Sequence, residues 1–270
     1  MSGSLNIAIS AARAAGRVIM RNLSRIDTLD VGHKSRNELV SEVDRQAELE
    51  IIRVIRRAHP DHAILAEESG ADGEGEHRWV IDPLDGTTNY LHGFPQFAVS
   101  IALQVHGRAQ CGVVYDPLRE ELYTAERGQG AQLDGKRIRV AARTKLADAL
   151  IGTGIPYRAN TEWLDTSLAM MRDVIMHTRG LRRPGAAALD LAWVAAGRLD
   201  GFWEFGLAPW DVAAGGLIVR EAGGRISDFD GGEGYVESGN VVAGSPKIYA
   251  QLSRLLAPHW ARSRRSAAGD

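Results

Sequence analysis

Asp82-Pro83-Leu84-Asp85-Gly86-Thr87-Thr88-Asn89, entered through the apolar run Trp79-Val80-Ile81, is the stretch around which the rest of the chain is organised. Val80 and Ile81 favour a strand, Pro83 disfavours its continuation, and Gly86 permits an unusual backbone angle. The last three residues of the stretch are common at helix starts. We therefore predict a strand, a tight turn and a helix N-terminus.

The same stretch carries candidate metal and anion ligands. Across such a turn, Asp82 and Asp85 can direct two carboxylates at one point, and the carbonyl of Leu84 can face the same way. Hard oxygen ligands of this kind suit Mg²⁺. The amides of Gly86 and Thr87 would open the helix and receive an anion beside the metal. Metal and phosphate together indicate phosphoryl chemistry, whereas two aspartates around a proline are, taken alone, most often a solvated turn.

The composition is that of a globular chain without a nucleic-acid signature. Its 270 residues are 44% hydrophobic and 24% charged, with a formal net charge of -2. This balance offers no basic surface for strong direct nucleic-acid binding. Cys111 is the only cysteine, which excludes an intramolecular disulfide framework and fits a reducing compartment. Without a signal segment or an apolar run of membrane-spanning length, we expect a soluble, cytoplasmic protein with no membrane partner.

Two helices are predicted before the central stretch. Residues 5–23 place apolar side chains at three-and-four spacing, which indicates an amphipathic helix. After a polar loop, Ser41-Glu42-Val43-Asp44 resembles a capping box for a second helix that ends before Pro60. The cap is a sufficient structural role for Asp44.

A further acid follows the next predicted strand. Residues 62–66 form a short apolar run that leads to Glu67-Glu68, and the glycine-rich and acidic residues 70–76 are interpreted as a flexible link. Glu67 and Asp82 thus lie at the ends of neighbouring strands, where both can reach one metal. An exposed glutamate pair is the alternative, and it is favoured if the segment is taken alone.

The remaining pattern divides into two halves, which we predict as 1–145 and 146–270. Residues 97–104, 109–115, 121–125 and 131–133 read as antiparallel strands separated by turns. A strand over 149–154 and helices over 161–178 and up to 195 then indicate an α/β half.

The end of the chain supplies a fourth candidate metal ligand. Pro209-Trp210-Asp211 follows a strand over 202–205 and opens a helix in which Asp211 is predicted to be the N-cap. An acid at this helix start, directed toward Asp82 and Asp85, would also bind metal. Strands over 226–229 and 241–243 and a helix over 246–256 close the chain, and 262–265 is predicted to be a frayed tail.

Together these motifs resemble the inositol monophosphatase family of Mg²⁺-dependent, lithium-sensitive phosphatases, most closely its bacterial inositol-1-monophosphatase branch. The resemblance runs from the first helix to about Leu256. It implies an α/β fold with α-β-α-β-α layers, an active site between the two halves, and a homodimer. It is carried by Leu65-Ala66-Glu67-Glu68-Ser69, by 79–89, by Gly185-Ala186-Ala187-Ala188-Leu189-Asp190 and by Pro209-Trp210-Asp211-Val212-Ala213-Ala214-Gly215.

The resemblance implies that the enzyme uses two or three Mg²⁺ ions and is inhibited by Li⁺. Glu67, Asp82 and the Leu84 carbonyl would hold the first ion. Asp82, Asp85 and Asp211 would hold the second, and a third, weaker ion would attach through Glu67. Metal-activated water would then attack the phosphate of myo-inositol 1-phosphate, or of a related sugar or polyol monophosphate, without a covalent intermediate.

The resemblance also assigns catalytic and substrate roles. Thr87, with Asp44 behind it, would orient the attacking water. Ala186 stands where the family commonly has threonine or serine, so a hydroxyl near the substrate is missing and the implied sugar preference is weakened. Lys34 matches a loop lysine near the third-metal region. Substrate contacts are implied for Asp85, Gly86, Thr87, Gly185, Ala186, Ala187, Glu204 and Asp211, with Arg183 at the rim.

Two alternatives stay open at this point. Related enzymes act on fructose 1,6-bisphosphate, nucleotide 3'-phosphates or NADP, but the short loop over 70–77 and Glu204 resemble the inositol group more closely. Members of the bacterial branch have also been linked to transcription antitermination, so the chain could act as a binding module for RNA polymerase or a transcription factor. The four acids favour retained catalysis, since carboxylates that repel one another serve no purpose without metal.

Overall fold

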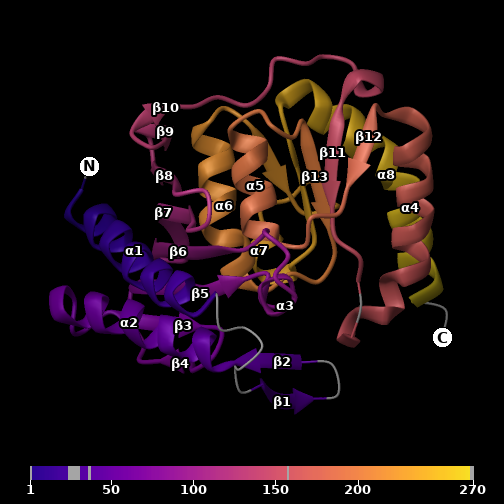
Figure 1. Ribbon diagram of the computed structural model, residues 1–270. Coiled ribbons are helices and arrows are strands. Elements are labelled where there is room, and N and C mark those ends of the chain that lie inside the picture. Colours follow the sequence, from indigo (N-terminus) through magenta and orange to yellow (C-terminus); the bar gives the residue numbers. More distant parts are fainter. Residues whose placement is uncertain (1, 24–30, 36–37, 157, 268–270) are drawn as a thin grey trace.

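Helices and sheets alternate as layers in the computed structural model, which describes residues 2–23, 31–35, 38–156 and 158–267 (Figure 1). One pair of helices covers the outer face of a large sheet, a second pair lies between the two sheets, and a third covers a smaller sheet. The predicted α-β-α-β-α fold is thereby confirmed. From one side to the other, the helical pairs are α1 (Gly3–Leu23) with α2 (Glu42–Ala58), α5 (Ala187–Ala195) with α6 (Pro209–Glu221), and α4 (Leu164–His177) with α8 (Pro246–Ala267).

The large sheet contains eight strands within the described residues. Neighbouring strands pair antiparallel except β3 and β5, which run parallel and so bring their carboxyl ends to the same edge. The predicted proximity of those two strand ends is therefore confirmed. In pairing order the strands are β10 (Lys136–Arg137), β9 (Gly130–Leu133), β8 (Glu121–Glu126), β7 (Arg108–Asp116), β6 (Ala98–Val105), β5 (His77–Asp85), β3 (Ala63–Ala66) and β4 (Gly70–Asp72).

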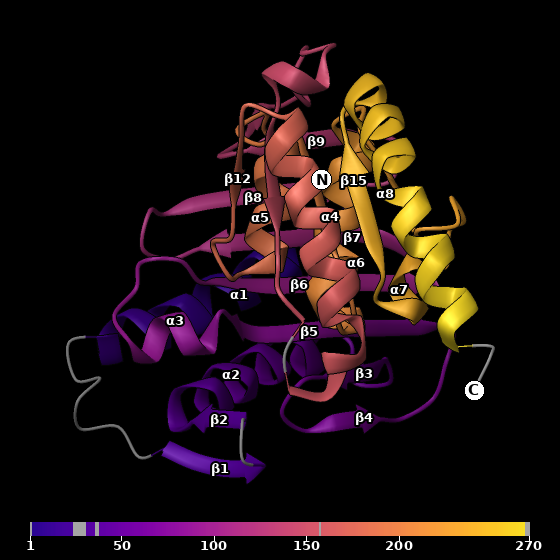
Figure 2. The same cartoon turned by 90° about the vertical axis from the view of Figure 1, so that its right-hand side faces the viewer.

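The small sheet, with five strands in the described part of the chain, mixes parallel and antiparallel pairs. Figure 2 shows strands β5 to β8 of the large sheet running across the direction of β15. In pairing order the strands of the small sheet are β12 (Gly180–Arg182), β11 (Leu150–Thr153), β13 (Gly201–Glu204), β15 (Val241–Gly244) and β14 (Arg225–Ser227). The short elements outside both sheets are strands β1 (Val31–Ser35) and β2 (Glu38–Ser41), helices α3 (Thr87–Leu91) and α7 (Tyr235–Ser238), and the 3-10 turns Leu146–Asp148 and Arg158–Trp163.

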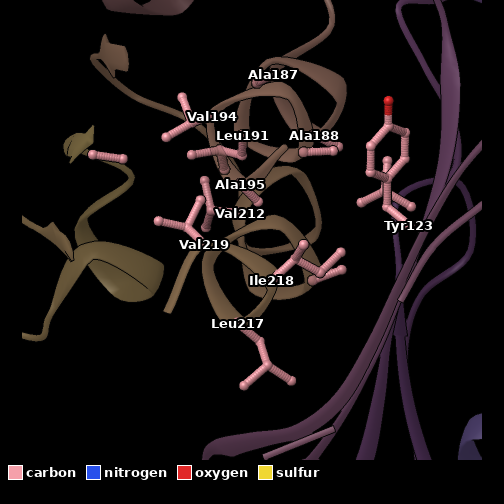
Figure 3. Close-up of a cluster of buried hydrophobic side chains, with 14 of the residues drawn as sticks. Tyr123, Ala187, Ala188, Leu191, Val194, Ala195, Val212, Leu217, Ile218 and Val219 are labelled. Atoms are coloured by element: carbon pink, nitrogen blue, oxygen red, sulfur yellow. The ribbon is translucent and has the colours of Figure 1, made fainter. Parts of the chain in front are cut away.

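An apolar core around α5 and α6 joins the two sheets (Figure 3). Tyr123 of the large sheet and Phe202 of the small sheet belong to the same buried cluster. The two helices approach closely because Gly215 has no side chain where it faces Leu191: a Cβ at Gly215 would lie 2.7 Å from the Cβ of Leu191. Full burial of a branched side chain such as Ile218 contributes roughly 1.5–3 kcal/mol. This core holds the two sheets in a fixed relation.

Several local predictions were wrong. Residues 70–76 were predicted to be a flexible link, but they include strand β4, which pairs with β3. The final helix does not stop near Leu256 but continues to Ala267, so residues 262–265 are helical. Asp230 accounts for this extension, because it accepts a 3.0 Å hydrogen bond from Trp260 Nε1 and pairs with Arg264 at 3.0 Å. The polar loop predicted before the second helix contains strand β1. Strands β1, β2, β10 and β12 and helix α7 were not predicted, and each is only two to five residues long.

Within the described residues, no helix is long and apolar enough to cross a membrane. The division at residues 145 and 146 falls between β10 and β11 and stays a prediction.

Candidate metal and phosphate site

The end of strand β5 brings two aspartates to one edge of the large sheet. The strand is buried from Trp79 through Leu84. Pro83 does not end it, contrary to the prediction; instead the pairing with β6 shifts register between Asp82 and Asp85. Such a bulge re-aims side chains next to it. Asp82, 1% exposed, keeps its geometry because its Oδ1 accepts a 2.9 Å hydrogen bond from the amide of Leu84.

Helix α6 brings the third aspartate from the second half of the chain. Ala208 caps the helix and Asp211 is its third residue, so the prediction that Asp211 is the N-cap was wrong. Its Oδ2 instead accepts a 2.7 Å hydrogen bond from the amide of Ala208. The hydroxyl of Ser100 on β6 donates to the carbonyl of Trp210 at 2.8 Å, which ties the start of α6 to the large sheet.

Among the described residues, Asp82, Asp85 and Asp211 form one group whose ligand oxygens lie within 4.8 Å of one another. Burial, followed by the charges of neighbouring carboxylates, raises the pKa of Asp82 and of Asp85 well above the usual range. Burial also raises the pKa of Asp211 to about 6, although the Ala208 amide counteracts it. Uncompensated carboxylates at this spacing repel one another, so the group favours a cation.

Glu67 adjoins this group from the turn after β3. Its amide donates to the carbonyl of Ile81 on β5 at 3.1 Å, and its carboxyl lies close enough to that of Asp82 for each residue to affect the pKa of the other. The residue as a whole is exposed to solvent, although its carboxyl lies beside the other acids. Partial burial and the charges of Asp211 and Asp44 still raise the pKa of Glu67 to about 8. The structure thus brings all four predicted acids to one place.

The turn between β5 and α3 is set by one glycine. Gly86 has φ 91°, and a Cβ there would lie 2.7 Å from the carbonyl oxygen of Gln96. Thr87 begins the short helix, and its hydroxyl donates to the carbonyl of Leu84 at 3.0 Å. Asp44 is buried on α2, close enough to Glu67 for its charge to raise that pKa. The pairing of Thr87 with Asp44 stays a prediction.

The loop before α5 closes the site from the second half. The amide of Ala188, in the first turn of α5 directly after this loop, donates to Asp85 Oδ2 at 2.7 Å, so a metal-ligand candidate is joined directly to the start of that helix. Asn89 Nδ2 donates to the carbonyls of Pro184 at 2.9 Å and Gly185 at 3.2 Å. These contacts fix the loop against helix α3.

The predicted substrate residues lie along this loop and the end of β13. Gly185 has φ 87°, and a Cβ there would lie 2.8 Å from Nη1 of the exposed Arg183. Ala186 and Ala187 are buried. Glu204 packs so closely against Gly154 that a Cβ on the glycine would overlap its carboxylate. Burial and the charge of Asp211 raise the pKa of Glu204 to about 8.

Sequence reasoning missed three residues of the site. Asp190 is 1% exposed on α5, and burial, then the charges of Glu204 and Asp85, raise its pKa. Asn89 was quoted only as part of the helix start, and Glu48 on α2 was assigned no role. Glu48 lies four residues after Asp44, a spacing that puts both on one helix face; that spacing was the available signal. The side chain of Lys34 lies outside the part of the chain whose side chains are described.

Comparisons with known proteins agree with this geometry. Residues 2–263 match the model of the inositol monophosphatase family. Nus factor SuhB of Pseudomonas aeruginosa is 52% identical over 264 residues, which cover 96% of this chain and 97% of that relative. Nus factor SuhB of Escherichia coli K12 is 50% identical over 246 residues, covering 90% and 92%.

Solved structures share the fold over nearly the whole length. The extragenic suppressor protein suhB from Bartonella henselae superposes with a TM-score of 0.91 at 46% identity, covering 94% of this chain and 98% of that chain. The inositol monophosphatase from Anabaena (Nostoc) gives a TM-score of 0.83 at 40% identity, covering 93% and 94%.

Proposed function

Because the chain belongs to the inositol monophosphatase family, we propose that this phosphatase hydrolyses myo-inositol 1-phosphate and related sugar or polyol monophosphates with the help of Mg²⁺. The observation that carries the proposal is the group formed by Asp82, Asp85 and Asp211, whose oxygens lie within 4.8 Å of one another although they come from strand β5 and helix α6.

The residues present fit Mg²⁺. All the side-chain donors are carboxylate oxygens, the ligand type that this ion prefers. Asp82 is buried beside other acids that raise its pKa, so a divalent cation would relieve a repulsion that the fold otherwise carries. Glu67, Asp82 and the Leu84 carbonyl would hold one ion, and Asp82, Asp85 and Asp211 a second, with Glu67 available to a third. Mg²⁺ so bound would neutralise the phosphate and lower the pKa of the attacking water.

The chain's own groups would orient water and phosphate. The hydroxyl of Thr87 donates to Leu84, which leaves its oxygen lone pairs to accept a hydrogen bond from the attacking water. Asp44 would support Thr87 in this orientation. The amides of Gly86 and Thr87 at the start of α3 would donate to phosphate oxygens, and because the positive φ of Gly86 fixes these amides in advance, they need no reorganisation during the reaction.

The alcohol part of the substrate would lie between Glu204 and the loop before α5. Glu204 and Asp85 would accept hydrogen bonds from ring hydroxyls, and the backbone from Gly185 to Ala187 would contribute further contacts, with Arg183 at the rim. A site built to hydrogen-bond hydroxyls rejects analogues that lack them. With Ala186 in place of a hydroxyl residue, backbone groups and Glu204 would supply most of the selection between polyols.

The test is Mg²⁺-dependent phosphate release from myo-inositol 1-phosphate, fructose 1,6-bisphosphate and a nucleotide 3'-phosphate. We expect preference for the inositol ester, inhibition by Li⁺, and loss of turnover in Asp85→Asn. The exposed Asp61 gives a matched control, because Asp61→Asn removes the same charge outside the site. Absence of metal-dependent release from all three esters would rule out the proposed activity. We further propose that the protein is a homodimer and that it lies in the cytoplasm. Sedimentation of the purified protein would test the homodimer.

A second role in transcription antitermination is favoured by the relatives that carry the name Nus factor, at 50–52% identity. We propose that this chain also binds RNA polymerase or one of its transcription factors. Pull-down of those partners with wild type and Asp85→Asn separates the roles. Partner binding unaffected by the substitution would indicate a function independent of hydrolysis, and absence of partner binding by the wild type would contradict the second role.

A further inference from the structure

Glu48 on helix α2 is a buried carboxylate that binds the backbone next to Glu67. Its side chain is 3% exposed. Oε2 accepts a 2.8 Å hydrogen bond from the amide of Glu68, and Oε1 accepts a 2.9 Å hydrogen bond from the amide of Ser69. Both oxygens of one carboxylate are thus used on two consecutive amides, 20 and 21 residues away in the chain.

These contacts complete the anchoring of the turn that carries Glu67. The amide of Glu67 is fixed to the carbonyl of Ile81, the residue before Asp82. The turn connects β3 to β4, whose pairing ends at Ala66 and Gly70, so the ladder holds both ends of the turn. Between these ends, Glu48 holds the two amides that follow Glu67. Hydrogen bonds from amides to an ionised carboxylate are stronger than neutral ones.

We propose that Glu48 is a positioning residue that holds Glu67 in the orientation needed for Mg²⁺. The carboxylate of Glu48 faces the backbone of the turn and acts through Glu67 without itself reaching the ion. Groups that orient a metal ligand typically affect metal affinity by about 10- to 100-fold. This inference rests on the proposed use of Mg²⁺.

The test compares Mg²⁺ binding by calorimetry, in the absence of substrate, for wild type and Glu48→Gln. The substitution keeps the side-chain length but replaces one acceptor oxygen by an amide nitrogen that cannot accept a hydrogen bond. We expect the dissociation constant for Mg²⁺ to rise about tenfold, with a matching rise in the Mg²⁺ concentration for half-maximal phosphate release and nearly unchanged turnover at saturating Mg²⁺. Glu50→Gln is the matched control, because Glu50 is on the same helix and pairs with Arg53 at the surface.

Amide hydrogen exchange provides a second readout, and its wild-type measurement does not depend on whether a variant folds. In the metal-free wild type, the amides of Glu68 and Ser69 should exchange slowly, and in Glu48→Gln they should exchange faster while the α5 and α6 core is unchanged. Exchange at the rate of an open loop in the wild type would overturn the proposal. Should Glu48→Gln fail to fold, Glu48→Asp, which keeps the charge and shortens the reach, is expected to show the same weakened Mg²⁺ binding.

The outcomes separate this proposal from the proposed function. A wild type that binds no Mg²⁺ would overturn both. Wild-type binding with a dissociation constant within about twofold in Glu48→Gln would overturn the positioning role alone, since a residue that orients a metal ligand changes affinity by more than that.

Discussion

Buried aspartates occur in two contrasting surroundings in this molecule. Asp116 is fully buried, and it accepts hydrogen bonds from the amides of Leu118 and Arg119. It also forms an ion pair with the Arg119 side chain at 2.6 Å. Asp200 is equally buried, and its Oδ2 accepts from the amide of Leu150 at 2.8 Å and from Arg143 at 3.0 Å. Each of these carboxylates faces a cation.

Asp82 is as deeply buried as Asp200, yet its charged neighbours are acids. A buried charge that is unpaired costs several kcal/mol, and no stability argument explains why three more carboxylates should converge on it. The contrast separates structural from functional acids. Asp116 and Asp200 are each paired with an arginine of the same chain, whereas the acids around Asp82 require a bound cation to balance their charge. The three predictions below test this difference.

The largest expected difference is in activity. Asp82→Asn should lower Mg²⁺-dependent turnover by about three orders of magnitude, equivalent to about 4 kcal/mol of barrier, because the amide oxygen can still accept from Leu84 but the negative charge for metal is gone. Asp200→Asn should leave turnover within a few-fold of wild type. Phosphate release at saturating Mg²⁺ measures both. Comparable losses in the two variants would mean that burial, and not the acid group, determines activity.

The second difference is in stability: substitution of Asp82 and of Asp200 should change the free energy of unfolding in opposite directions. In metal-free protein, Asp82→Asn should raise the free energy of unfolding by roughly 1 kcal/mol, the usual size of a single-substitution effect, because the like-charge repulsion is reduced. Asp200→Asn should lower it by about 1–3 kcal/mol, because hydrogen bonds to a charged group are lost. Urea unfolding in EDTA measures both values. A destabilised metal-free Asp82→Asn would contradict the contrast.

The local sequence was sufficient to predict part of this arrangement. Asp82 and Asp85 share one short motif, and Glu67 was found as an acid at the end of a neighbouring predicted strand, with its ligand role implied by the family resemblance. Asp211 was found as an acid at a helix start, although its place in the first turn was wrong: only the fold shows that its carboxylate turns back to the amide of Ala208.

Contacts between distant backbone and side-chain groups could not be predicted in this way. Glu48 binds backbone amides, and since every residue except proline offers an amide, no residue type marks the partner. The bulge past Pro83 depends on pairing with β6, which propensity alone does not encode. In the same way, the length of α8 depends on Asp230, which is 30 residues from Trp260.

The smallest expected difference is a dependence of stability on pH that Mg²⁺ should abolish. In the folded chain the pKa is about 8 for Glu67 and Glu204 and about 6 for Asp211, above their ordinary values of 4.5 and 3.8. The metal-free folded state therefore binds more protons than the unfolded chain between about pH 4 and pH 8, and its stability falls as pH rises through that window.

Thermal unfolding in EDTA should show a melting temperature that falls by a few degrees from pH 6 to pH 8, and added Mg²⁺ should raise it more at pH 8 than at pH 6, because protons and metal compete for the same oxygens. Asp82→Asn should flatten the metal-free profile, since one of the interacting carboxylates is removed, whereas Asp200→Asn should lower the profile without changing its slope. A metal-free melting temperature that stays constant between pH 6 and pH 8 would show that the acids are paired within the chain after all, and Asp82 would then belong with Asp116 and Asp200.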